Sequence, residues 1–452
     1  MASIMTRKRR ARISPTYMVF MWFGSFILTG TVLLWLPWAH VDSVKGFTVV
    51  DALFTAVSAA CVTGLSVVNV ADTFSFFGQF VIFLLMEMGG MGIMSFASLG
   101  FRILGRRLSM QQQAATANAF FQNDAASEFK QTFMAIFRIT ALIQAAGALG
   151  MGIALAPHHW ESDPWFCVWS AIFHSASAFC NSGFTLYRDG LSGFLTNYPF
   201  LALILVLVTL GGLGHIVLNE LYRLPGELRR RAHKPRYISL HTRVVLSMTA
   251  LLIAVGVLFI YCLGSGDEKT TLWQAVFETI SGRTAGFSIQ AQSRLPLPTI
   301  LVMLLLMFIG GSPGSCAGGI KTTSLAIWAA RIRANLRNDS NVNMFGYTIA
   351  PELVSRARIL MAVTVIWNIV GVFILSITNP GQDLQTLMFE QISAFGTVGL
   401  SMDFTPELTT AARLWVIVSM FVGRLGPLSI ALWVVRPSRV KINQPIGRVM
   451  IG

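Results

Sequence analysis

Charged side chains are scarce in this chain of 452 residues: Asp, Glu, Lys and Arg make up only 12%, while 54% of the residues are hydrophobic. A soluble domain carries about 25% charged residues, so this composition excludes an ordinary soluble domain. Apolar runs of about 20 residues, long enough to span a bilayer, recur instead. We expect eight membrane spans, near residues 17–36, 76–101, 133–155, 196–222, 242–263, 297–330, 359–378 and 409–435.

Cysteine and the signatures of enzymes are also scarce. The five cysteines show neither a close pair nor a metal-ligand spacing, so we expect small apolar filler at Cys61, Cys167, Cys180, Cys262 and Cys316. The chain has no His-Glu-x-x-His motif and no pair of catalytic acids on a span, which argues against an enzyme working in the membrane. It also has no strand–GxGxxG–helix unit and no P-loop, so any nucleotide control must come from a partner.

Basic residues outnumber acidic ones, and the net charge is +14. This charge is not spread as in a nucleic-acid-binding protein, because 26 of the 34 Lys and Arg residues fall in five clusters, at 1–16, 102–138, 223–243, 331–358 and 436–452. The clusters lie on every second side of the predicted spans. The positive-inside rule then predicts a multi-pass protein of the cytoplasmic membrane with both termini in the cytoplasm. We expect no nucleic-acid partner, and we expect the basic face to contact lipid headgroups.

Four short segments share one template: Phe, three residues, Ser, four or five residues, then Gly, Leu or Phe, and a hydroxyl residue. Their glycines, 119, 103 and 113 residues apart, are Gly64, Gly183, Gly286 and Gly399. Each segment lies between two predicted spans and is too short and polar to cross. The pattern predicts an all-α membrane protein with four span–pore-loop–span repeats around a central pore, comprising eight transmembrane helices and four short pore helices. The expected repeats are 1–108, 109–232, 233–340 and 341–452, the last including a C-terminal tail.

In each copy the Phe–Ser stretch has helical spacing, and Asp51 is the expected N-cap of the first helix. The negative end of each helix dipole then points at the glycine segment, which favours a cation. Non-helical backbone at this depth must line protein or water, and its carbonyls can bind an ion as a potassium filter does. The alternative is that the glycines only allow close helix packing. The predicted filter residues are Val62, Thr63, Gly64, Asn181, Ser182, Gly183, Thr284, Ala285, Gly286, Thr397, Val398 and Gly399.

A second repeated element begins 25, 28, 24 and 24 residues after the filter glycines, at Gly89, Gly211, Gly310 and Gly423. In the third repeat it expands into a Gly-, Ser- and Pro-rich loop, 310–321, that cannot continue a helix. We expect an intramembrane gate beneath the filter. Its predicted residues are Gly310, Gly311, Ser312, Pro313, Gly314, Ser315, Gly318, Gly319, Lys321 and Arg424.

Three charged residues near these elements need a partner or water. Arg424 is interpreted as a cation barrier below the filter, with a structural ion pair or a side chain that reaches to the membrane interface as the alternatives. Arg283 stands three residues before Gly286, and we expect it to be a structural brace paired with Glu278 or Glu390. For Glu87, a hydrogen bond to a neighbouring helix competes with a cation stop in the inner cavity.

These motifs resemble the Trk/Ktr/HKT superfamily of potassium transporters. The resemblance rests on Thr-Val-Gly-Leu at 397–400, Arg-Thr-Ala-Gly-Phe at 283–287 and the loop at 310–321, and it covers essentially the whole chain. The chain looks most like the Ktr-type membrane subunit, because about sixteen residues precede the first span and because of the ending Gly447 to Gly452.

The resemblance implies potassium uptake by a homodimer with one pore per protomer. It also implies a gate made of the loop and the arginine, under a cytosolic ring of nucleotide-binding, RCK-type subunits. Potassium would be the transported ion, the nucleotide would sit on the partner, and this chain would bind no cofactor of its own. Glycine at all four filter positions matches the potassium-selective pattern. Copy two reads Cys-Asn-Ser-Gly at 180–183, where many relatives have Asn-Asn-Ala-Gly, which leaves sodium stimulation and strict selectivity open.

Two alternatives remain within this superfamily: a Trk-type potassium transporter and a sodium-coupled cation carrier. Outside it, a secondary transporter with broken helices is the competing class. Such carriers usually show two inverted repeats, whereas the basic clusters here give four repeats of one orientation. That arrangement favours a channel-like path.

Overall fold

The computed structural model describes residues 15–41, 46–91, 126–159, 163–229, 238–264 and 270–426. The predicted cytoplasmic termini and the C-terminal tail lie outside these residues. The first half contains helices α1 (Pro15–Trp35), α2 (Val49–Ala60), α3 (Val70–Thr73), α4 (Phe76–Gly90), α7 (Ala126–His159), α8 (Pro164–Phe179), α9 (Tyr198–Leu213) and α10 (His215–Arg229). The second half contains α11 (Leu240–Leu263), α12 (Leu272–Gly282), α13 (Leu297–Phe308), α14 (Thr322–Leu336), α15 (Pro351–Thr378), α16 (Leu384–Gly396) and α17 (Thr410–Leu425).

Short elements complete the description. Four 3₁₀ turns follow or join the helices: η1 (Pro37–Ala39), η2 (Ser192–Phe194), η3 (Gln292–Arg294) and η4 (Thr405–Glu407). The only sheet among the described residues is a hairpin after α14, in which β1 (Asn343–Met344) pairs antiparallel with β2 (Tyr347–Thr348). The protein is therefore a helical bundle, as the apolar composition predicts.

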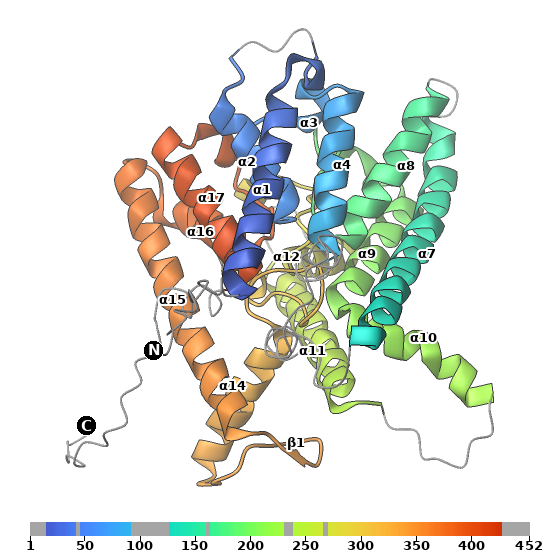
Figure 1. The fold of residues 1–452 in the computed structure, drawn as a ribbon. Coiled ribbons are helices and arrows are strands. Elements are labelled where there is room, and N and C mark those ends of the chain that lie inside the picture. Colours follow the sequence, from blue (N-terminus) through green and yellow to red (C-terminus); the bar gives the residue numbers. More distant parts are fainter. Residues whose placement is uncertain are drawn as a thin grey trace, which may run out of the picture.

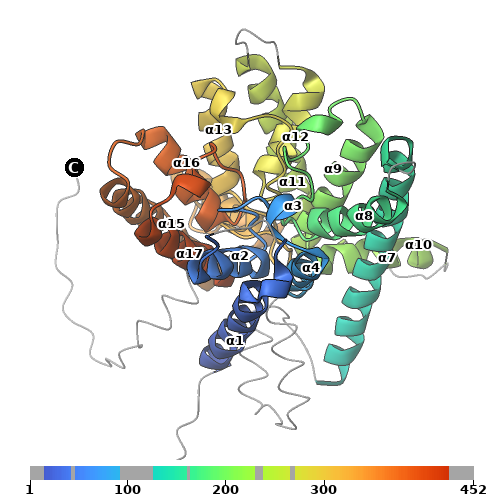
Figure 2. The same cartoon turned by 90° about the horizontal axis from the view of Figure 1, so that it is seen from above.

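The helices form four groups around a common centre. Figure 1 shows the bundle from the side, and the view from above in Figure 2 shows the groups in four sectors. The groups are α1, α2 and α4; α7, α8 and α9; α11, α12 and α13; and α15, α16 and α17. Each group contains one helix that ends toward the centre, namely α2, α8, α12 or α16. These are the four segments that carry the Phe–Ser–Gly template.

Capping residues explain why the short central helices begin where they do. Thr48 caps α2, and its backbone N–H donates to Asp51 Oδ2 (2.9 Å), which completes a capping box. Asp51 is therefore the third helical residue of α2, and its prediction as the N-cap was wrong. Thr271 caps α12 in the same way, and the side chain of Asp163 caps α8 just before Pro164.

Helices stand in the described part of each predicted span, but not all of these helices run straight, and the ends of the predicted spans 76–101 and 409–435 lie outside the described residues. The predicted span 196–222 is bent by 103° between α9 and α10, and the predicted span 297–330 is two helices, α13 and α14, with a loop between them. Among the described residues three helices are individually long and apolar enough to cross a membrane, or four if the bent pair counts as one span. The bend at Gly214 has a local cause, because its φ of +90° lies outside helical geometry.

Polar contacts join neighbouring groups around the outer rim. They connect the first group to the second, the second to the third, the third to the fourth, and the fourth back to the first. In that order the contacts are Asp72 Oδ1 with Arg188 Nε (2.7 Å), Ser288 O with Leu191 N (3.1 Å), Ser293 Oγ with Asp403 Oδ2 (2.8 Å) and Arg413 Nη1 with Asp51 Oδ1 (2.5 Å). The rim is thus closed on all four sides.

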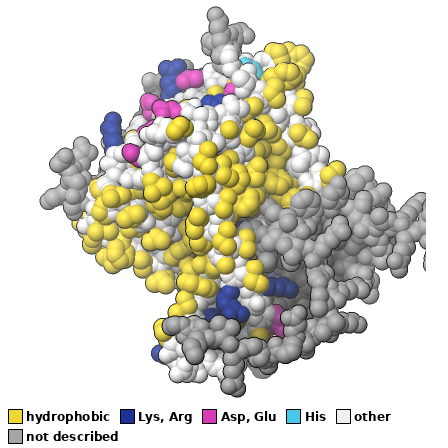
Figure 3. All heavy atoms as spheres, turned by 90° about the vertical axis from the view of Figure 1, so that its left-hand side faces the viewer, with side chains coloured by type: hydrophobic (Ala, Val, Ile, Leu, Met, Phe, Trp, Pro, Cys, Tyr) yellow, Lys and Arg dark blue, Asp and Glu magenta, His cyan; other side chains and the backbone are white. Residues whose placement is uncertain are grey.

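The outside of the bundle is apolar over a broad band. Figure 3 shows hydrophobic side chains across the middle of one face, with basic and acidic side chains above and below the band. Many large apolar side chains on this surface are exposed, including Ile369 (64%) and Phe373 (67%) of α15. A water-soluble protein rarely leaves so large an apolar surface uncovered, so the band fits a bilayer.

Candidate pore and gate

The four template glycines meet in a closed ring at the centre of the bundle. A Cβ atom placed on each glycine would contact the carbonyl oxygen of the residue that precedes the glycine of the next repeat. The pairs run in order around the ring: Gly64 with Ser182, Gly183 with Ala285, Gly286 with Val398, and Gly399 with Thr63. Four carbonyl oxygens from four distant parts of the sequence therefore converge there. We call these glycines and the two residues before each of them the glycine ring; they are the twelve predicted filter residues.

The backbone repeats the same unusual geometry in all four segments. Two residues before each glycine the chain is left-handed, with φ values of 57°, 58°, 67° and 48° at Val62, Asn181, Thr284 and Thr397. The glycines themselves have φ values of 93°, 70°, 76° and 95°. β-Branched residues such as valine and threonine rarely adopt a left-handed conformation. Such backbone strain is kept only where the surrounding structure imposes it, which is typical of binding sites.

The template serine holds each segment in this shape. The N–H of the residue before the glycine donates to the serine carbonyl at 2.8 to 2.9 Å in every repeat; the pairs are Thr63 with Ser58, Ser182 with Ser177, Ala285 with Ser281, and Val398 with Ser393. In the first repeat the Ser58 hydroxyl also donates to Leu65 O (2.7 Å) and accepts from Gly64 N (3.1 Å). The serine of the template is therefore a support for the glycine ring.

The field at the ring is set by helix ends. Helices α2, α8, α12 and α16 end three or four residues before their glycines, so four partially negative C-termini point at the ring. None of the twelve residues of the ring carries a charged side chain. Backbone carbonyls and helix dipoles together favour a cation that has shed its water.

The 310–321 loop lies beneath the ring. A Cβ atom on Gly318 would contact the Thr397 hydroxyl and would lie 2.9 Å from Gly396 O, at the inner end of α16. The two ends of the loop are tied together, because Gly310 N donates to Ile320 O (2.9 Å) and Thr322 N donates to Gly311 O (3.1 Å). The loop is not helical, as its Gly, Ser and Pro content predicts.

Contacts from the second group fix the middle of the loop. Ser312 N donates to Gly212 O (3.1 Å), and Cys316 N donates to Gly211 O (3.3 Å). In return His215 N, at the start of α10, donates to Gly314 O (3.1 Å). Gly211 and Gly212, which begin the repeated glycine element of the second repeat, therefore bind the loop directly.

Arg424 reaches the same loop from the fourth group. Its guanidinium donates to the carbonyl oxygens of Cys316, in the loop, and Gly89, at the end of α4. No described acid forms an ion pair with it. The alternative prediction of a structural ion pair is therefore wrong for the described residues, none of which compensates the positive charge of Arg424.

Lys321 and Ser312 hold the loop from within. Lys321 is partly buried, and its Nζ donates to Ala317 O at 2.5 Å, which closes the last turn of the loop. The buried Ser312 hydroxyl lies 3.2 Å from that of Thr322, at the start of α14. The ten residues predicted to form a gate thus lie in one connected cluster around the loop.

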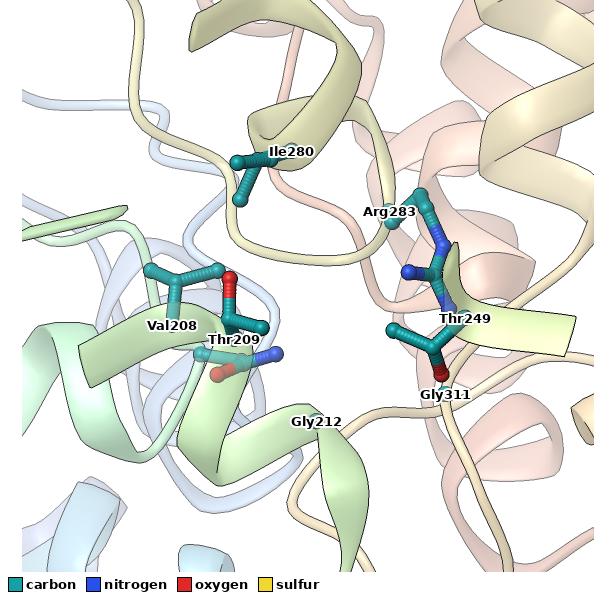
Figure 4. Close-up of a pocket in the computed structure, with 8 residues that line it drawn as sticks. Val208, Thr209, Gly212, Thr249, Ile280, Arg283 and Gly311 are labelled. Atoms are coloured by element: carbon teal, nitrogen blue, oxygen red, sulfur yellow. The ribbon is translucent and has the colours of Figure 1, made fainter. Parts of the chain in front are cut away.

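Arg283 does not have the partner that was predicted for it. Neither Glu278 nor Glu390 forms an ion pair with it, and its buried Nε has no hydrogen-bond partner in the described part of the chain. Figure 4 shows its guanidinium pointing toward Thr249 and Gly311, across a small cavity from Val208. Measured as space for the centre of a water-sized sphere, the cavity holds about 10 Å³, which is room for roughly one water.

The half-buried Glu87 and the buried Glu390 are bonded to neutral side chains instead. Glu87 accepts from Gln144 Nε2 of α7 (2.7 Å), which is the predicted hydrogen bond to a neighbouring helix. Glu390 accepts from the hydroxyls of Ser401 (2.8 Å) and Thr405 (2.7 Å), just outside the glycine ring. Burial of a carboxylate requires such partners.

Two features of this region were not predicted from the sequence. In three repeats the residue directly after the template Phe is polar and fully buried; these residues are His174, Glu278 and Glu390. Each contacts the segment after a ring glycine or the loop that follows that segment. Extending the template by this one position would have revealed them. Cys316 was interpreted as filler, yet its thiol donates to Gly90 O (3.2 Å) and its carbonyl binds Arg424. No spacing signal marks a residue that acts through its backbone.

The fold and this central site define a helical transport protein of membranes. A family model described as a cation transport protein, TrkH, matches residues 6–441, and the chain belongs to this family. Among its relatives, the potassium/sodium uptake protein NtpJ of Enterococcus hirae is 33% identical over 464 residues, with 100% of both chains covered. The Ktr system potassium uptake protein B of Bacillus subtilis is 34% identical over 450 residues, covering 98% of this chain and 97% of that protein.

A solved structure has the same fold. The potassium transporter TrkH of Vibrio parahaemolyticus superimposes with a TM-score of 0.70 over 95% of this chain and 87% of that one, at 19% sequence identity. The resemblance to a Trk/Ktr-type protein is therefore confirmed.

Proposed function

We propose that this chain takes up potassium across the cytoplasmic membrane through a channel-like pore, with the glycine ring as its selectivity filter. The observation that carries the proposal is the convergence of four backbone carbonyls in one repeated backbone geometry. Carbonyl oxygens replace the water shell of a potassium ion, and four negative helix ends lower the cost of bringing the charge there. The names of the relatives, which state potassium or potassium/sodium uptake, support the choice of ion.

The proposal includes four span–pore-loop–span repeats with the boundaries given above, and a gate below the filter. The gate is the 310–321 loop held by Arg424, because both lie under the ring and no described acid forms an ion pair with Arg424. A fixed positive charge at that depth repels a cation that leaves the filter. Displacing the loop therefore opens the path.

Control of the gate is proposed to come from outside this chain. Relatives are named as part of a Ktr system, which supports a membrane subunit working with a regulatory component. We propose a homodimer of this chain on a cytosolic ring of nucleotide-binding, RCK-type subunits. The termini and the basic clusters face that ring in the cytoplasm.

Uptake of rubidium or potassium by liposomes that contain the purified chain tests the function directly. We expect uptake that saturates with potassium, is slower with sodium, and rises when the cytosolic subunit and its nucleotide are added. Potassium-limited growth of an uptake-deficient host, with and without that subunit, is the test in cells. Sodium uptake without potassium uptake in liposomes, together with no rescue of potassium-limited growth, would overturn the proposal.

A sodium-dependent mode is the second candidate, because the relative from Enterococcus hirae is named for both ions. It predicts that external sodium raises potassium uptake by the same liposomes. Measuring potassium uptake with sodium replaced by choline separates stimulation from simple permeation.

A further inference from the structure

The bend between α9 and α10 creates a groove on the outside of the bundle. Because α10 leaves α9 at 103°, it runs outward beneath the lower end of α7 (Figure 1). Helices α7 and α10 contact each other, and the corner between them encloses about 560 Å³. Sites that hold small ligands or ligand headgroups typically have volumes of about 300–1,000 Å³.

The described lining of the groove carries two positive charges and no acid. Arg138 of α7 and Arg223 of α10 line it together with Asn219 and Tyr222, and no Asp or Glu does. Neither arginine forms an ion pair with any described residue. Glu220, the acid of α10 that lies closest in sequence, accepts hydrogen bonds from Ser239 N and Ser239 Oγ (both 2.7 Å) and so is engaged elsewhere. Among the residues that the structure describes, these two guanidinium groups therefore lack a counter-charge.

The lining changes from polar to apolar along α7. Phe137 and Leu142 line the same groove and expose 46% and 61% of their surface. Arg138 is the fifth residue of the apolar stretch Met134–Pro157, so it lies at the edge of the apolar band, and Leu142 lies one helical turn further into it. Only 28% of the most apolar part of this stretch is buried within the protein, so most of α7 faces outward, where a membrane protein meets lipid.

We propose that this groove binds one anionic phospholipid. Arg138 and Arg223 hold the phosphate, Asn219 and Tyr222 face its polar headgroup, and an acyl chain follows Phe137 and Leu142. The order of a charged end and an apolar end matches a phospholipid and does not match a free anion, which has no use for the apolar part. Basic pockets between membrane helices on the cytoplasmic side are a recurrent type of lipid site. The site is separate from the glycine ring and does not depend on the proposed pore.

Lipid binding to the purified chain in nonionic detergent tests the site. The probes are phosphatidylglycerol, phosphatidylcholine and inorganic phosphate, and the readouts are retained lipid by native mass spectrometry and the shift in melting temperature. The test variant is Arg138→Gln with Arg223→Gln. The matched control is Arg333→Gln with Arg358→Gln, which removes two basic residues of the connecting segment 331–358 that lie outside the groove.

We expect phosphatidylglycerol to bind and stabilise the wild-type protein and the control, and to bind the test variant about thirtyfold more weakly. Equal losses in the test variant and the control would overturn the proposal, since they indicate a diffuse surface charge. Equal stabilisation by phosphatidylcholine would overturn it as well, and so would full stabilisation by inorganic phosphate alone.

A lysine version, Arg138→Lys with Arg223→Lys, keeps both charges and replaces the glutamine version if that variant does not fold. It is expected to prefer phosphatidylglycerol to phosphatidylcholine. A lysine variant without that preference would overturn the proposal.

Discussion

Arg424, near the end of α17, donates a hydrogen bond to the backbone carbonyl oxygen of Cys316, 108 residues earlier in the chain. The bond attaches a charged side chain of the fourth group to the loop of the third, directly beneath the glycine ring. Carbonyl oxygens can satisfy the N–H groups of a guanidinium, but they leave its unit charge in place. The contact therefore fixes the loop and maintains a positive potential at the same point.

Replacement of Gly64 by serine should weaken the preference for potassium over sodium. A Cβ atom at this position would overlap Ser182 O, and the φ of +93° is unfavourable for serine, so one of the four carbonyls must move. The sodium/potassium permeability ratio in liposomes measures the effect. Gly24→Ser is the matched control, because nothing lies within 4 Å of its Cβ position. An unchanged ratio in a well-folded Gly64→Ser protein would remove Gly64 from the filter.

The ion pair between Asp51 and Arg413 should stabilise the fold. It joins the first helix group to the fourth at 2.5 Å, and the two side chains are only 8% and 22% exposed. Loss of one partner leaves a partly buried charge unpaired, so Arg413→Gln should lower the free energy of unfolding by about 2 kcal/mol. This is less than the loss expected when a fully buried ion pair is broken, because water partly solvates this pair. Thermal unfolding in detergent measures this. Arg188→Gln, which breaks the exposed pair with Asp72, should change it little; equal losses would contradict the prediction.

Glu390 should be required for the shape of the fourth segment. Its carboxylate accepts from the hydroxyls of Ser401 and Thr405, and Ser401 Oγ in turn accepts from Phe404 N (3.2 Å). Glu390→Gln loses the charge of this acceptor, so we expect a loss of about 1 to 3 kcal/mol in unfolding free energy and a changed sodium/potassium permeability ratio. The exposed Glu407→Gln is the control. A less stable protein with an unchanged ratio would limit Glu390 to a structural role.

Local signals in the sequence predicted the parts of the site that depend on local geometry. The Phe–Ser–Gly template predicted four short helices that each end in a non-helical glycine segment, because serine spacing and glycine conformation act within about ten residues. The bend at Gly214 was missed, since the apolar run 196–222 continues across it. The lack of an acidic partner for Arg283 and the hydroxyl partners of Glu390 were also missed. Which buried groups meet across distant helices depends on the closure of the whole ring, and a single sequence contains no signal for it.

Shortening the 310–321 loop by removing 311–318 should give a leaky transporter. The loop lies under the glycine ring, and the pairing of Gly310 N with Ile320 O shows that its two ends are already close enough to rejoin. Ion flux should then persist without the cytosolic subunit. Flux through liposomes and the elution volume of the purified protein measure both properties. A folded variant with no flux would make the loop part of the conduction path and would exclude a movable plug.

Arg424→Ala should raise the rate of cation flux and make it less dependent on the cytosolic subunit. A unit charge about 5 Å from a permeating cation, in a watery cavity of dielectric near 40, contributes roughly 1.5 kcal/mol to the barrier, or about tenfold in rate. Arg424→Lys keeps the charge but cannot donate to Cys316 O and Gly89 O with one planar guanidinium group, so its effect should be smaller.

The exposed Arg337→Ala, at the end of α14, controls for loss of a positive charge elsewhere. Rubidium uptake and melting temperature are measured on the same preparations. Since no described acid is left unpaired by the alanine, a faster and folded protein is expected; a destabilised and slower one would assign Arg424 to the support of the loop alone.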